Sequence, residues 1–127
     1  MRNLFFILIF SLSLSISSEE TISRWMADYF KRIHDHIGNE NYEKAQYELE
    51  MGDKNYFRGG RTYEAALLYQ LYGQFYAVQS QYTNAIPWFE KALATGKMPR
   101  IGQQEVRFQL AQTYFMIGNY ENVIPLL

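Results

Sequence analysis

The 127-residue chain contains no cysteine. This absence excludes disulfide bonds, thiolate metal sites, catalytic thiols and a lipid-modified N-terminal cysteine. The chain also has no large excess of charge of either sign, because 12 basic side chains nearly balance 13 acidic ones and the formal net charge is −1. The chain therefore has neither the basic surplus typical of nucleic-acid binding nor an acidic tail, and we expect no nucleic-acid partner. Its length is enough for one domain.

Residues that carry chemistry are equally scarce. The two histidines, His34 and His36, are two positions apart, so on a helix they point to different sides, whereas zinc requires three or four converging ligands. The RGGR stretch at residues 58–61 lacks the GKS or GKT ending of a phosphate-binding loop. The sequence also has no G-x-S-x-G elbow, glycine-rich dinucleotide loop or H-E-x-x-H pair. We therefore predict no enzymatic activity, no metal and no cofactor.

Aromatic residues, in contrast, are abundant, at 17% of the chain. Apolar side chains recur at steps of three and four from Ile22 to Ile37, which predicts an amphipathic helix that ends at Gly38. A second helix is expected from about Glu40 to Met51, followed by a stop at residues 52–55 and a polar, glycine-rich linker. Because no strand pattern is evident, we expect the aromatic rings to pack between helices.

The N-terminus has a different composition. Arg2 precedes an apolar run at residues 4–16, and small serines follow at positions 15, 17 and 18. This order is typical of a secretory signal peptide, which we assign to residues 1–18. The alternative is a retained membrane anchor, although a membrane-spanning helix needs about 20 apolar residues. The remaining chain, residues 19–127, is the predicted folded domain, with no membrane span after cleavage.

An internal repeat organises that domain. The sequence YTNAIP at residues 82–87 reappears as YENVIP at residues 120–125, an offset of 38, and Tyr76 corresponds to Tyr114. The earlier sequence YEKA at residues 42–45 precedes YTNA by 40 residues. A period between 20 and 50 residues is typical of a solenoid of supersecondary units. The two prolines, Pro87 and Pro125, are expected in about the first turn of the second helix of their units.

These residues resemble the tetratricopeptide repeat (TPR), with its W-x2-L-G-x2-Y, A-x3-F and A pattern. The resemblance implies an all-α, right-handed solenoid of antiparallel helix pairs. The implied solenoid has about 2.5–3 repeats, with units at residues 22–52, 62–97 and 103–127. The last unit is incomplete, and its second helix is expected from about Tyr120 to Leu127. The positions that match the signature, and that should form the core, are Tyr69, Gly73, Tyr76, Tyr82, Ala85, Phe89, Ala92, Ala111, Tyr114 and Tyr120.

The resemblance also implies a concave groove, formed by the first helix of each pair, that binds a peptide or a helix. The lysine-and-asparagine clamp of some family members is absent, because glutamine or phenylalanine occupies those positions. The alternative for Phe108 and Phe115 is that they pack against a following helix. The groove positions carried over from the family are Phe30, His34, Leu67, Gln70, Gln74, Val78, Phe108, Gln112 and Phe115.

Together, the export signal and the repeats resemble periplasmic TPR proteins, including those associated with TonB-type energy-transducing systems. The resemblance implies a non-enzymatic adaptor in the cell envelope that binds other proteins, such as components of outer-membrane transport. Two alternatives remain open at this point. The chain could be a structural subunit that associates with itself, or the accessory repeat domain of a longer protein.

Overall fold

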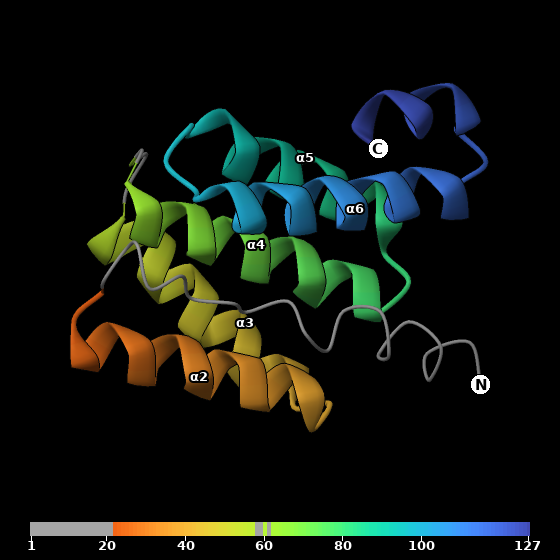
Figure 1. Cartoon of the computed structure of the whole chain (residues 1–127). Coiled ribbons are helices and arrows are strands. Elements are labelled where there is room, and N and C mark those ends of the chain that lie inside the picture. The colour runs from red at the N-terminus through yellow and green to blue at the C-terminus, as the bar shows by residue number, and fades with distance from the viewer. Residues whose placement is uncertain (1–21, 58–59, 61) are drawn as a thin grey trace.

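The computed structural model describes residues 22–57, 60 and 62–127. This part of the chain is all-helical, with five α-helices and no strand, which confirms the predicted all-α class (Figure 1). The proposed signal peptide, residues 1–18, lies outside the described residues. Among the described helices, none is both long enough and apolar enough to cross a membrane.

The first pair of helices follows the predicted periodicity. Helix α2 (Arg24–Gly38) begins after Ser23, whose hydroxyl oxygen accepts a hydrogen bond from the Met26 N–H at 3.3 Å. Helix α3 (Tyr42–Met51) buries Ala45 and Leu49. The buried side of α2 consists of Tyr29, Phe30, Ile33 and Ile37.

Helix α3 ends at Met51, as predicted, but Gly52 does not end the helical backbone. Instead, the chain continues from α3 as a π-helical turn, η1 (Gly52–Tyr56), and Gly52 itself has right-handed helical backbone angles. A Cβ atom at this position would collide with the Tyr29 hydroxyl group. Gly52 is therefore needed for close packing against α2, and it does not act here as a helix terminator.

The second pair forms the centre of the molecule. Helix α4 (Tyr63–Val78) begins after Thr62, whose hydroxyl oxygen accepts a hydrogen bond from the Ala65 N–H at 3.1 Å. It packs against α5 (Tyr82–Ala94) and also contacts α2 and α3, so that nearly all of its side chains are buried. Pro87 lies in the second turn of α5, one turn later than expected, and the helix continues through it.

Helix α6 (Arg100–Met116) packs on α5 and is followed by two short 3₁₀ turns, η2 (Tyr120–Asn122) and η3 (Ile124–Leu126). The α-helix expected from Tyr120 is therefore wrong. Pro125 has no N–H group and disfavours α-helical angles at Ile124, although the same Ile-Pro step is accommodated inside α5. The segment instead forms tighter bonds, from the Val123 N–H to the Tyr120 carbonyl and from Leu126 to Val123, each 3.1 Å.

The ends of α2, α4 and α6 share one turn geometry. Glu40, Ser80 and Gly118 each have positive φ, at 58°, 62° and 78°, and they lie 40 and 38 residues apart. After each of these residues, the next N–H donates to the carbonyl five positions earlier: Asn41 to His36, Gln81 to Tyr76, and Asn119 to Tyr114, at 2.8–2.9 Å. This is the Schellman arrangement that ends a helix, and it recurs with the offsets seen in the sequence.

Most of the positions in the TPR signature lie inside the molecule. Gly73 packs directly against the Phe89 ring, and Tyr72 stacks on Trp88 with ring centroids 3.9 Å apart. Tyr120 differs, because it is 61% exposed in a 3₁₀ turn and cannot be a core residue. The other signature residues are buried (Tyr69, Gly73, Ala85, Phe89, Ala92 and Ala111) or partly buried (Tyr76, Tyr82 and Tyr114).

Candidate protein-binding surface

Five of the nine predicted groove residues cannot line an open groove in this structure, because their side chains are buried. Four of the five lie on α4, which packs against α2, α3 and α5 and has nearly all of its side chains buried. Phe30 lies in the same core on α2. The sequence-based assignment is therefore wrong for Phe30, Leu67, Gln70, Gln74 and Val78.

The buried amides have a structural role instead. Gln70 of α4 donates from Nε2 to Oε1 of Gln109 on α6, with 3.2 Å between these atoms. The Thr113 hydroxyl donates to the Gln109 carbonyl at 2.7 Å. Buried amide groups need such partners, because an unpaired one costs about 1–3 kcal/mol. Gln109 and Thr113 were not predicted, and no local sequence pattern distinguishes them from exposed polar residues of the same helix.

The other predicted groove residues remain accessible. His34 and Gln112 are partly exposed, whereas Phe108 and Phe115 project from α6 with 53% and 57% of their surface exposed. Ile101, at 64% exposed, lies seven residues before Phe108, and Phe115 lies seven after it. Seven residues are close to two helical turns, so the three side chains share one side of α6. We call Ile101, Phe108 and Phe115 the α6 stripe; the spacing was visible in the sequence, but Ile101 was missed.

A cleft borders the α6 stripe. Its volume is about 410 Å³, and α6 and η3 form its walls. Further apolar surface continues past the cleft at Tyr120, whose ring centroid lies 5.3 Å from that of Phe115, and at the exposed Ile124. The residues that line the cleft are Gln104, Arg107, Phe108, Leu126 and Leu127.

A second depression, of about 540 Å³, lies between α2 and α3 and has a mixed lining. An ion pair between Arg32 and Glu48 crosses it and joins the two helices. The hydrogen bond to Glu48 raises the pKa of Arg32, so this guanidinium remains charged. The lining residues are Arg32, His36, Asn41, Glu43, Lys44, Tyr47 and Glu48. Neither here nor elsewhere in the described part of the chain do three His, Cys, Asp or Glu side chains converge on a possible metal position.

The strongest pKa shifts belong to core tyrosines. Burial raises the pKa of Tyr29 and of Tyr72, and nearby carboxylates add to the effect, Glu48 for Tyr29 and Asp53 for Tyr72. The Tyr29 hydroxyl donates to the Glu48 carbonyl oxygen. Both phenols are held neutral by packing inside the helical pairs, so the shifts reflect the core and indicate no reactive group.

Comparisons of the chain with models of protein families, with curated proteins and with solved structures find no match. The resemblance to TPR proteins therefore stays a prediction from the residues of this chain.

Proposed function

We propose that this chain is a non-enzymatic protein-interaction scaffold of the TPR type, and that the α6 stripe is its contact surface. The observation that carries the proposal is the exposure of Ile101, Phe108 and Phe115 on one side of one helix. Apolar side chains gathered on one exposed side of a helix are typical of a surface that another molecule covers. A partner with apolar side chains fits the stripe and the adjoining cleft.

The repeated helix ends support the solenoid part of the proposal. Three helices end in the same hydrogen-bonded turn at offsets of 40 and 38 residues, and the two offsets found between sequence repeats are the same. Stacked units of this kind bury their apolar sides against their neighbours.

The proposal includes a setting in the cell envelope. Its support is the signal-peptide pattern of residues 1–18 together with the resemblance to periplasmic TPR proteins. In this setting the partners are envelope proteins, among them components of a TonB-type outer-membrane transport assembly. His34 and Gln112, the partly exposed polar groove residues, are available to hydrogen-bond a bound segment.

Site-specific photocrosslinking tests the contact surface. A photoreactive phenylalanine analogue is placed at Phe108 or Phe115, and at the exposed Thr83 of α5 as a matched control. After irradiation of intact cells, we expect discrete protein adducts from the two α6 positions and none from position 83. Absence of adducts from α6, or equal adducts from all three positions, would contradict the proposal.

Cell fractionation tests the setting separately. A tagged chain should be found in the periplasmic fraction, with a mass that corresponds to cleavage near Ser18. An unprocessed chain in the cytosol would contradict export, and an unprocessed chain in the membrane fraction would instead favour the retained anchor.

A further inference from the structure

The charges beside the α6 stripe restrict what can cover it. Arg100 and Arg107 are exposed on the same edge of α6, seven residues apart. Neither forms an ion pair within the part of the chain that the structure describes. On a helix, seven residues correspond to a rise of about 10.5 Å. A complementary partner therefore presents two carboxylates at a similar spacing, which face the two arginines. Between the carboxylates it presents an apolar side chain, which faces the α6 stripe.

Helix α3 of the same protein presents this pattern. Its outward side carries Glu43 and Glu50, also seven residues apart, with Tyr47 between them. Tyr47 is 63% exposed, and it points away from the buried Ala45 and Leu49. We call Glu43, Tyr47 and Glu50 the α3 face. Lys44 lines the α2–α3 depression together with Glu43 and Tyr47, so the α3 face borders this depression.

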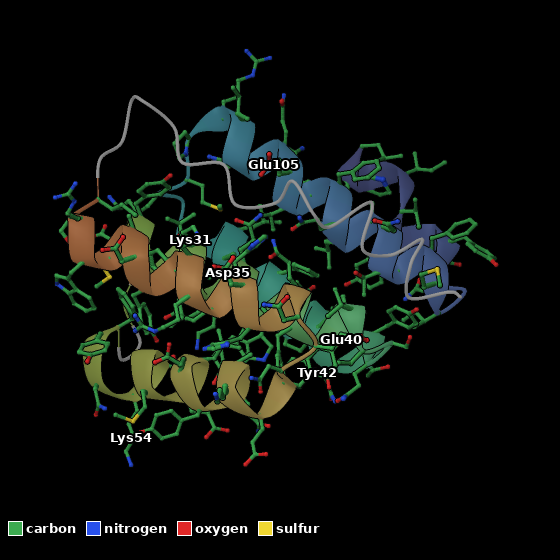
Figure 2. All side chains as sticks on the ribbon, turned by 90° about the horizontal axis from the view of Figure 1, so that it is seen from below. Lys31, Asp35, Glu40, Tyr42, Lys54 and Glu105 are labelled. Atoms are coloured by element: carbon green, nitrogen blue, oxygen red, sulfur yellow. The ribbon has the colours of Figure 1, made fainter. Side chains whose placement is uncertain are left out.

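Both acids are available for a partner. Glu50 accepts a hydrogen bond from the Gln46 amide at 2.9 Å, but neither Glu43 nor Glu50 forms an ion pair within the described residues. In the view of Figure 2, α2, which carries the labelled Lys31 and Asp35, lies between α3 and α6. Within the described residues, no ion pair joins α3 to α6.

We propose that the α6 stripe binds the α3 face of a second copy of this chain. Glu43 and Glu50 then pair with Arg100 and Arg107, and the Tyr47 ring enters the cleft beside Phe108. This inference rests on the proposed function to the extent that α6 is a protein-binding surface. It adds the identity and the orientation of the partner.

The geometry has a direct consequence for assembly. The two surfaces differ, so each bound copy leaves one α3 face and one α6 stripe free. Such head-to-tail contacts form either a closed ring or an open chain, and they do not stop at a symmetric dimer unless two contacts close on each other. The ion pairs are exposed at the rim, so salt should weaken the contact.

Sedimentation of the full 127-residue chain tests this. At low salt we expect the average mass to rise with protein concentration above that of the monomer, and to fall back toward the monomer in about 0.5 M salt. A monomer at every concentration in low salt would overturn the inference.

Charge reversal tests the pairing itself. Two double variants are made, Arg100→Glu/Arg107→Glu and Glu43→Arg/Glu50→Arg. Each should abolish self-association, because it gives both surfaces the same sign of charge. An equimolar mixture of the two variants should associate again, since the α6 stripe of each variant then meets an α3 face of opposite charge on the other. The control Arg24→Glu/Lys97→Glu, at exposed positions outside both surfaces, has the same change in net charge as the arginine variant and should associate like the parent chain.

Each outcome is decisive. Association that survives both reversals, or that the mixture fails to restore, would overturn the pairing, and circular dichroism shows whether each variant is folded. If photocrosslinks from Phe108 join a different protein and the chain sediments as a monomer, the second copy is excluded while the scaffold function stands. If no adduct and no association occur, both proposals fail.

Discussion

At the scale of single residues, Gly73 and Phe89 determine how closely α4 approaches α5. A Cβ atom on Gly73 would lie 2.5 Å from two atoms of the Phe89 ring, well inside van der Waals contact. Phe89 is completely buried and held between helices, so its ring has little freedom to move aside. The glycine matters here because it has no side chain, and its backbone angles are ordinary helical ones.

Substitution Gly73→Ala should therefore destabilise the chain. Overpacking costs about 1–3 kcal/mol, and the better helix propensity of alanine returns only about 1 kcal/mol. Phe89→Ala alone should cost about 3–5 kcal/mol through lost burial and a cavity. In the double variant the two costs should not add, because the smaller residue removes the collision. Urea unfolding measures all three, with Gly38→Ala as the control, where a Cβ meets nothing within 4 Å.

The buried hydroxyl group of Tyr72 predicts a loss of stability in alkali. Burial raises the pKa of this phenol above its ordinary value of about 10. Above pH 10 the unfolded chain releases the proton before the folded chain does, so the free energy of unfolding falls as pH rises. The slope is about 1.4 kcal/mol per pH unit for one such group.

Tyr72→Phe should reduce this loss, since the ring remains stacked on Trp88 but the titrating group is gone. Unfolding free energies at pH 8 and pH 11 provide the measurement. The exposed Tyr47→Phe serves as the control. An equal pH dependence in the parent chain and the Tyr72 variant would contradict the assignment.

At the scale of elements, the helix ends at Glu40 and Gly118 have the same turn but different residues. A residue with a side chain costs about 1–2 kcal/mol in the left-handed conformation, whereas glycine adopts it freely. Glu40→Gly should stabilise the chain by about 1 kcal/mol after the entropy of the more flexible unfolded state is subtracted. Gly118→Glu should destabilise it by a similar amount. Thermal unfolding compares the two, and a loss of stability in Glu40→Gly would show that the glutamate makes a compensating contact.

Periodicity predicted these elements well where one side of a helix faces the core. Helix α2 is the clearest case, since its apolar steps match its four buried side chains. The errors occurred where tertiary packing decides the local structure. Helix α3 ends at Met51 as predicted, but Gly52, expected to begin a stop, instead begins a π-helical turn that packs closely against Tyr29. Pro125 was expected in a helix like that of Pro87, yet the segment around it forms 3₁₀ turns.

At the scale of the whole molecule, the Gln70–Gln109 hydrogen bond joins the central helix α4 to α6. Gln109→Leu should cost about 1–3 kcal/mol, because the Gln70 amide loses this partner inside the core. The double variant Gln70→Leu/Gln109→Leu should recover part of that loss. Chemical unfolding gives the comparison, with Gln104→Leu, on the exposed side of α6, expected within about 0.5 kcal/mol of the parent.

The binding surface was less predictable than the fold for a physical reason. Positions carried over from a family assume that the first helix of each pair lines an open groove, but the α4 positions are buried, whereas Phe108 and Phe115 of α6 are exposed. Whether Gln74 or Gln112 reaches solvent depends on which helices cover it, and the sequence of its own helix does not contain this information. The seven-residue spacing of Ile101, Phe108 and Phe115 was in the sequence, although only the structure shows that no described helix covers it.

The positions of the two tryptophans give each of the first two helical pairs its own fluorescent reporter. Trp25 is half exposed on α2, with its ring against Tyr56, whereas Trp88 is stacked on Tyr72 between α4 and α5. Iodide should therefore quench the emission of Trp25 far more than that of Trp88. Variants that keep one tryptophan each would follow the unfolding of one pair at a time. Coincident curves would mean that the pairs unfold as one cooperative unit, and separated curves would reveal an intermediate with a single pair intact.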